Sequence, residues 1–165
     1  MASYEHVVHT FEPVFDKNSR ILILGSLPSV KSREAQFYYG HPQNRFWKLL
    51  ALLTNSSLPE NIGEKRELLL ANKIALWDVI QSCDIIGSSD SSIKNVVPCD
   101  LPGLLTRAPI ERIYGNGAKA CQLYRKYCQP KTGREILPLP STSPANAAFS
   151  LERLRKIWEE ELRLQ

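Results

Sequence analysis

Two short segments of the sequence carry most of the side chains that could do chemistry. The first is the loop 25–29, and the second is the run 38–47, which contains Tyr39 and Asn44. A flat aromatic surface beside a carboxamide suits a planar heterocyclic ligand, because the ring can stack on it and the amide can bond to its edge. The loop lacks the spaced glycines of a dinucleotide-binding turn and the Gly-Lys-Ser/Thr of a P-loop, so a phosphate cradle is not expected.

The candidate groups are mostly neutral. They are hydroxyls and carboxamides from several segments, with one carboxylate: Ser26, Asn44, Asp78, Asn116, Ser141, Thr142, Ser143 and Asn146. No G-x-S-x-G elbow, H-E-x-x-H motif or well-spaced carboxylate pair is present. Of the three histidines, only His41 falls in a candidate site, and its simplest interpretation is a structural hydrogen bond. Such groups can orient water and bond to the edge of a base, which suits a reaction with a dissociative transition state.

Strands and helices must bring these groups together. Apolar runs predict strands at 21–24, 74–80, 110–114 and 135–139, and helical spacing predicts helices at 46–54, 63–72, 101–106, 118–128 and 150–164. The polar, serine-rich segment 82–100 is expected to be a long surface connection. The alternation predicts an α/β fold, a three-layer α/β/α sandwich with a central four-stranded parallel sheet. Because the carboxyl ends of parallel strands meet at one edge, the candidate groups should converge there in an active site.

Composition sets wide bounds. The 165 residues are expected to form one domain over 1–165, and 43% hydrophobic with 23% charged residues is typical of a globular protein. No run approaches the ~20 apolar residues of a membrane span. The start of the chain lacks the layout of a signal peptide, so a cytoplasmic location is expected, associated with the nucleoid in a prokaryote. The four cysteines form no C-x-x-C pair, so we expect buried, reduced thiols and neither a metal nor a cofactor.

Two motifs resemble those of the uracil-DNA glycosylase superfamily. The first motif of its mismatch-specific branch has a glycine loop, then an aromatic residue and the run H-P-x-N-R-F-W. Here the run is 41–47, and His41 follows Gly25 by sixteen residues. The segment 140–146, Pro-Ser-Thr-Ser-Pro-Ala-Asn, resembles the second motif, whose loop inserts into DNA. The resemblance covers roughly residues 20 to 160 and implies the fold of that superfamily.

Two positions depart from the pattern of the superfamily. Leu27 stands where the first motif has a catalytic Asp or Asn, and Ser141 stands where the second opens with His or Asn. A G-S-x-P-S loop with an aromatic pair and the Asn of N-R-F-W resembles the hypoxanthine-DNA glycosylase branch. This resemblance implies a monofunctional enzyme that flips hypoxanthine, the deaminated form of adenine, out of DNA. It would then hydrolyse the glycosidic bond and leave an abasic site.

The resemblance also implies roles for single residues. Tyr39 would stack on the flipped base, and Asn44 would position the attacking water. Backbone amides of Ser26 and Leu27 could hold the carbonyl oxygen of the leaving base. Asp78 could accept the N1–H of hypoxanthine, a donor that adenine lacks.

Further contacts are expected around this core. Tyr38 is a second candidate for the base. Contacts to DNA are expected from the turn after the third strand and from the second motif: Asn116, Ser141, Thr142, Ser143, Ala145 and Asn146. Ala145 is too small to fill the gap left by a flipped base, so Asn146 or Phe149 could be the wedge.

Simpler structural interpretations stay open. Asn44 could cap the helix 46–54. One of Tyr38 and Tyr39 should belong to the core, and Asn116 could occupy a left-handed conformation. The basic residues at 31, 33, 45, 119 and 125 could be ordinary solvated charges, of which two meet DNA.

Rival functions also stay open. A glycosylase of the same superfamily could prefer uracil or xanthine. The loss of the carboxylate or amide at position 27 keeps a non-catalytic nucleic-acid-binding domain possible. A nucleoside hydrolase would need a carboxylate cluster for calcium, and the sequence offers none. We expect a monomer that acts on DNA containing a deaminated base.

Overall fold

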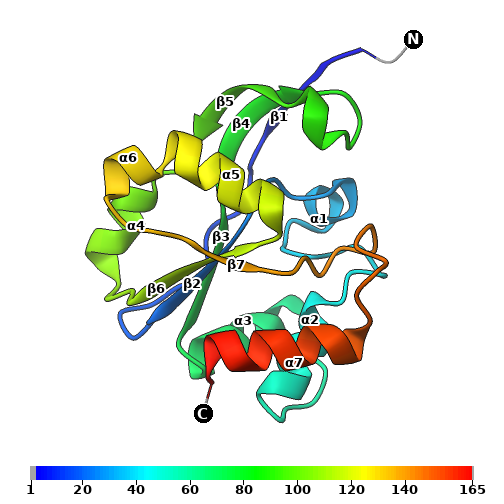
Figure 1. Cartoon of the computed structure of the whole chain (residues 1–165), viewed down its shortest axis with the longest axis vertical. Helices are drawn as coiled ribbons and strands as arrows, with labels where there is room; N and C mark the ends of the chain where they lie inside the picture. The colour runs from blue at the N-terminus through cyan, green and yellow to red at the C-terminus, as the bar shows by residue number, and fades with distance from the viewer. Residues whose placement is uncertain (1–2, 165) are drawn as a thin grey trace.

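A parallel sheet of four strands forms the centre of the computed structural model, which describes residues 3–164 (Figure 1). The strands lie in the order β3 (Ile74–Asp78), β2 (Ile21–Gly25), β6 (Arg112–Asn116) and β7 (Leu137–Leu139). Each strand runs parallel to its neighbour. The predicted four-stranded parallel sheet is therefore confirmed.

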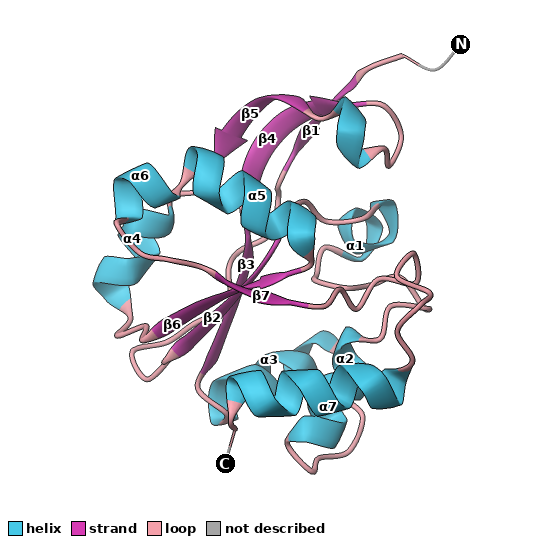
Figure 2. Cartoon of the chain, viewed as in Figure 1, coloured by secondary structure: helices cyan, strands magenta, loops and turns pink. Residues whose placement is uncertain are grey.

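Helices cover both faces of this sheet (Figure 2). On one face lie α4 (Leu101–Arg107), α5 (Ala118–Tyr127) and the short α6 (Gln129–Thr132). On the other lie α2 (Phe46–Leu53), α3 (Ile62–Ala71) and α7 (Leu151–Leu162). The short helix α1 (Val30–Ala35) follows the loop after β2 and was not predicted. The three-layer α/β/α arrangement is confirmed.

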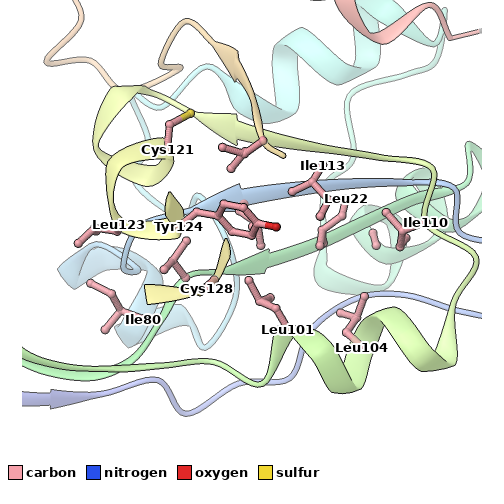
Figure 3. Close-up of a cluster of buried hydrophobic side chains, with 14 of the residues drawn as sticks. Leu22, Ile80, Leu101, Leu104, Ile110, Ile113, Cys121, Leu123, Tyr124 and Cys128 are labelled. Carbon is pink, nitrogen blue, oxygen red and sulfur yellow. The ribbon is translucent and has the colours of Figure 1, made fainter. Parts of the chain in front are cut away.

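The alternation of side chains along β2 explains why both faces need a cover. Leu22 and Leu24 belong to the hydrophobic cluster that contains Leu101 of α4 and Tyr124 of α5, part of which Figure 3 shows. Residues at the intervening positions, such as Ile23, belong to a second cluster that packs against α2 and α7. A strand buried on both faces appears in the sequence as a continuous apolar run, which is why it was easy to predict.

The predicted strand 74–80 is wrong at its end. β3 stops at Asp78, and β4 (Ile80–Ile85) begins after Val79 in a different sheet. The Val79 N–H donates to the Gly25 carbonyl at 2.9 Å, and the Val79 carbonyl accepts from the Cys99 N–H at 2.8 Å. The apolar run is continuous, but the chain passes from one sheet to the other at Val79.

The segment 82–100 is also not the irregular connection that its composition suggested. About half of it belongs to a three-stranded antiparallel sheet in the order β1 (Glu5–Val8), β4 and β5 (Lys94–Pro98). A 3-10 turn, η1 (Asp90–Ser92), lies before β5. β4 buries Ile80, Cys83 and Ile85, while the other residues of the strand stay partly exposed. Its partner β1 comes from the start of the chain, and no local pattern reveals such a pairing.

The four cysteines are free and buried, as expected for reduced thiols. Within residues 3–164, no helix has both the length and the apolar character needed to cross a membrane.

Candidate active site

A cavity of about 450 Å³ opens where β2, β3 and β6 end. Its lining includes nearly all residues that the sequence nominated: Ser26, Leu27, Tyr38, Tyr39, Asn44, Asp78, Asn116, Ser141, Thr142, Ser143 and Ala145. The two candidate wedge residues, Asn146 and Phe149, are not in the lining. The prediction that these segments converge at one edge of the sheet is confirmed, while the chemical role of each residue stays a prediction.

The loop after β2 forms part of the cavity wall and is tied down through its carbonyl groups. The Gly25 and Ser26 carbonyls accept from the N–H groups of Val79 and Ile80 at 2.9 and 3.0 Å. Gly25 is needed for its lack of a side chain, because a Cβ there would collide with Oδ1 of Asp78. The carboxylate therefore lies directly against the backbone of the loop.

Asp78 is buried at this edge and has a histidine partner. Its Oδ2 accepts a hydrogen bond from Nε2 of His9 at 2.8 Å, and the two side chains are only 5% and 1% exposed. Since a carboxylate can only accept, Nε2 must carry the hydrogen. His9 follows β1 and reaches the site because the second sheet docks beside β3. No local pattern in the sequence indicates this role for His9, and of the three histidines only His41 was expected in a candidate site.

The two adjacent tyrosines have different surroundings. Tyr38 is 2% exposed, and its hydroxyl donates to the Glu12 carbonyl at 2.8 Å, so it is chiefly a core residue whose edge reaches the cavity. Tyr39 is stacked on Phe46 with ring centres 4.1 Å apart, and it also lines the cavity. One of the pair belongs to the core, in line with the simpler interpretation.

The Tyr39 hydroxyl is buried without a hydrogen-bond partner among the described residues. Burial, and next the negative charge of Asp78, raise the pKa of the Tyr39 phenol well above its usual value, and the nearby Asn116 side chain offsets only part of this rise. The hydroxyl therefore stays protonated across the physiological range.

Asn44, Thr142 and Asn116 form a chain of hydrogen bonds across the cavity wall. Oδ1 of Asn44 accepts from the Thr142 hydroxyl at 2.8 Å and from the Phe46 N–H at 2.9 Å. Nδ2 of Asn116 donates to the Thr142 hydroxyl at 3.0 Å, and its Oδ1 accepts from the Thr142 N–H at 3.1 Å. Because both lone pairs of Asn44 Oδ1 are used, its Nδ2–H group is the part of the amide free to meet a ligand.

This chain alters two sequence-based interpretations. Thr142 is fully buried, so it positions Asn44 rather than presenting its hydroxyl to DNA. Asn116 does not have a left-handed backbone, and Gly117, with φ of 99°, takes that conformation instead. Asn44 does bond to the first N–H of α2, so it has a structural role in addition to its place in the cavity.

Arg45 holds the second-motif loop, residues 140–149, in place and is not a solvated charge. Its guanidinium donates to the carbonyls of Thr142 at 3.3 Å, Ser143 at 2.8 Å and Asn146 at 3.1 Å, and also to that of Phe149. Figure 1 shows this loop, in orange after β7, beside the cyan segment that precedes α2. One side chain of the first motif thus organises the loop of the second.

The two candidate wedge residues are both engaged within the protein. Nδ2 of Asn146 donates to the Ser141 carbonyl at 3.0 Å. Phe149 is partly buried against the core and lies under the guanidinium of Arg153, 4.2 Å from its ring centre. Ala145, by contrast, is exposed at the loop tip.

Other polar groups around the opening suit an anionic ligand. Arg33 and Lys119 line the cavity, as does the first turn of α5, which begins at Ala118. A helix N-terminus and nearby cations attract phosphate groups.

Nδ1 of His41 accepts from the Gln43 N–H at 3.1 Å, which supports the structural interpretation of that histidine.

Sequence and structure comparisons agree with this geometry. The family model described as the uracil DNA glycosylase superfamily matches residues 12–162, and the chain belongs to that superfamily. A protein from Methanosarcina acetivorans named hypoxanthine DNA glycosylase is 40% identical over 151 residues, covering 90% of this chain and 94% of the relative. A protein of the same name from Methanosarcina barkeri is 38% identical, covering 91% and 94%.

A solved structure shows the same fold. The solution NMR structure of a candidate uracil DNA glycosylase from Methanosarcina acetivorans superposes with a TM-score of 0.78 at 39% identity. The match covers 93% of this chain and 94% of that one. The resemblance inferred from the two motifs is therefore confirmed over most of the chain.

Proposed function

We propose that this protein is a monofunctional DNA glycosylase that excises hypoxanthine and leaves an abasic site. The observation that carries the proposal is the meeting of both motif loops around one cavity whose buried acidic group is Asp78. Two relatives that match over nearly their whole length, at 40% and 38% identity, bear the name hypoxanthine DNA glycosylase. Their names support hypoxanthine as the substrate of this protein.

Recognition of the base would rest on Asp78 and Tyr39. Hypoxanthine carries a donor at N1 beside the acceptor O6, and a carboxylate oxygen accepts from that N1–H. Adenine has a lone pair at N1, which the same oxygen would repel. One face of the Tyr39 ring packs on Phe46, so the opposite face can stack on a flipped base, a contact worth about 1–3 kcal/mol.

Cleavage would proceed with little nucleophilic help. The bond between C1′ and N9 breaks, its electron pair moves onto the base, and positive charge develops on the sugar. The N–H groups of Ser26 and Leu27 are candidates for stabilising the base as it becomes negative. Water then bonds to C1′, and its lost proton is taken up by the departing base. Asn44 would hold this water through Nδ2–H, a donor that positions the oxygen but cannot remove its proton.

Contacts to the DNA backbone would come from the rim of the cavity. Ser141 and Ser143 offer hydroxyls, and Arg33 and Lys119 offer positive charge. Ala145 lies at the exposed tip of the loop and would approach the gap left by the flipped nucleotide. We expect the protein to act as a monomer in the cytoplasm, which size-exclusion chromatography and cell fractionation would test.

A single-turnover excision assay tests the proposed substrate. Duplexes with one deoxyinosine, deoxyuridine, deoxyxanthosine or mismatched thymidine would be incubated with excess enzyme and then cleaved with alkali. Fast cleavage at inosine with slow cleavage at the others is the expected result. Preference for uracil or xanthine would overturn the substrate, and binding without any cleavage would favour a non-catalytic domain.

The role of Asp78 is tested by Asp78→Asn in the same assay. The matched control is Asp84→Asn, because Asp84 also bonds to a histidine but lies in the second sheet outside the cavity lining. We expect only the first variant to lose activity on inosine. An unchanged rate for Asp78→Asn would contradict base recognition by this carboxylate.

A further inference from the structure

His9 is a buried, titratable side chain beside the active site that the proposed function leaves without a role. Its imidazole is 1% exposed and bonds to Oδ2 of Asp78 at 2.8 Å. The other carboxylate oxygen, Oδ1, lies against Gly25 in the cavity lining. The two oxygens of one carboxylate thus face different partners.

We infer that His9 is a positioning residue for base recognition, which presents Oδ1 of Asp78 to the N1–H of a 6-oxopurine by binding Oδ2. This inference rests on the proposed function and deepens it. A free carboxylate rotates and can turn either oxygen, or neither, toward a ligand. With Oδ2 held against His9, Oδ1 is the oxygen that remains for a ligand in the cavity, and it can accept the single N1–H donor of hypoxanthine.

The imidazole is itself held rigidly enough to fix a partner. The His9 N–H donates to the Gln81 carbonyl at 2.7 Å, and the His9 carbonyl accepts from Nε2 of Gln81 at 3.1 Å. The ring packs against Phe11 and Tyr38, with ring centres 4.5 and 5.9 Å away. Backbone pairing places the residue and aromatic contacts orient its ring, so Nε2–H points to Asp78.

The reaction itself gives a second reason for a donor on Oδ2. When the glycosidic bond breaks, its electron pair moves onto the base that Asp78 contacts. A bare carboxylate at that place would repel the growing negative charge, and the repulsion is strong in a site shielded from water. A hydrogen bond from His9 draws charge away from the oxygen nearest the base. His9 would therefore improve both the recognition and the departure of the base.

The chain contains a matched pair outside the site. His6 lies on β1, three positions before His9, and its Nδ1 bonds to Oδ1 of Asp84 at 2.8 Å. Its side chain is 63% exposed, and neither partner lines the cavity. The same substitution at His6 therefore breaks a histidine–aspartate contact without touching the active site.

The test compares single-turnover excision of hypoxanthine by His9→Leu, His9→Gln, His6→Leu and Asp78→Asn, with His9→Leu also made in the Asp78→Asn background. Leu removes the donor, whereas the amide of Gln can reach the position of Nε2. We expect a loss of roughly 10- to 100-fold for His9→Leu. His9→Gln and His6→Leu should stay within about threefold of the wild type. With Asp78→Asn, His9→Leu should cause no further loss.

Three results would overturn the inference. The first is a wild-type rate for His9→Leu, and the second is a rate for His9→Gln as low as that of His9→Leu. The third is that His9→Leu causes the same fold loss in the wild type and in the Asp78→Asn background. If His9→Leu does not fold, His9→Gln is compared with His9→Asn, whose amide is too short to reach Asp78. Equal rates for these two variants would overturn the inference. Failure of the wild type to cleave the inosine duplex would instead remove the proposed function, and this inference with it.

Discussion

The hydroxyl of Thr142 donates a hydrogen bond of 2.8 Å to Oδ1 of Asn44, a residue 98 positions earlier in the chain. This bond joins the two motif loops inside the cavity wall and determines how the Asn44 amide is oriented. Oδ1 is turned toward the protein, where it meets Thr142 and the Phe46 N–H. What remains for a ligand is a donor, and this constrains any catalytic role of Asn44.

The first prediction separates the structural and catalytic roles of Asn44. Asn44→Ala loses both, so stability should fall by about 1–2 kcal/mol and excision of hypoxanthine by roughly 100- to 1000-fold. Asn44→Asp keeps an acceptor for Phe46 and Thr142 but loses Nδ2–H, so it should recover the stability and not the rate. Urea denaturation and single-turnover assays measure the two quantities. A rate for Asn44→Asp equal to or above that of the wild type would refute the donor role.

The second prediction concerns the ring and the hydroxyl of Tyr39. The hydroxyl is buried without a partner among residues 3–164, so Tyr39→Phe should be neutral or slightly stabilising and should leave excision nearly unchanged. Tyr39→Leu removes the stacking surface and should slow excision roughly 5- to 150-fold.

Tyr38→Phe serves as the control for the pair. It loses a hydrogen bond to the Glu12 carbonyl, so stability should fall by about 1 kcal/mol with little change in rate. Slow excision by Tyr39→Phe would show that its hydroxyl, and not its ring face, is what the reaction needs.

The third prediction concerns Arg45, whose planar guanidinium bonds to four carbonyl groups of the second-motif loop. Arg45→Lys keeps the charge but cannot reproduce this fork, so stability should fall by about 2–3 kcal/mol. Amide hydrogen exchange should rise within 143–149, and excision should slow because the loop loses its position. Arg125→Lys, an exposed position on α5, is the matched control and should change nothing. Unaltered amide exchange in Arg45→Lys would contradict the conclusion that Arg45 holds this loop in place.

The fourth prediction is a loss of stability at alkaline pH. Burial raises the pKa of the Cys128 thiol from 9.0 to about 11. Between these values the unfolded chain loses a proton that the folded protein keeps, so stability must fall as the pH rises. The slope for this thiol reaches about 1.4 kcal/mol per pH unit. Burial also raises the pKa of Cys99, Tyr38 and Tyr39, so they act in the same direction.

Urea unfolding at pH 8 and pH 10.5 measures this effect. Cys128→Ala removes the thiol and should reduce the alkaline loss by about 2 kcal/mol relative to the wild type. An identical pH dependence in both proteins would mean that Cys128 ionises as easily in the folded state as in the unfolded chain.

The sequence alone determined the central sheet and the identity of the loops at its edge. β2 is buried on both faces, so its apolar run can be recognised as a strand from the local sequence alone. Gly25, which follows the apolar residues 21–24, predicts the position of the site. The two motifs are local patterns for the same reason. They led to the correct superfamily and to about half of the residues that line the cavity.

Which polar groups meet depends on how the whole chain packs. His9 and Asp78 are 69 positions apart. They meet because β1, which ends just before His9, pairs with β4, which begins just after Asp78. The strands of that sheet are short and partly polar, so no local pattern distinguishes them from a loop. The same holds for Arg45, which looks like a surface charge until the carbonyls of a loop 97 to 104 residues away surround it. Periodicity reports which face of an element is buried, whereas hydrogen bonds between distant segments depend on how the whole chain packs.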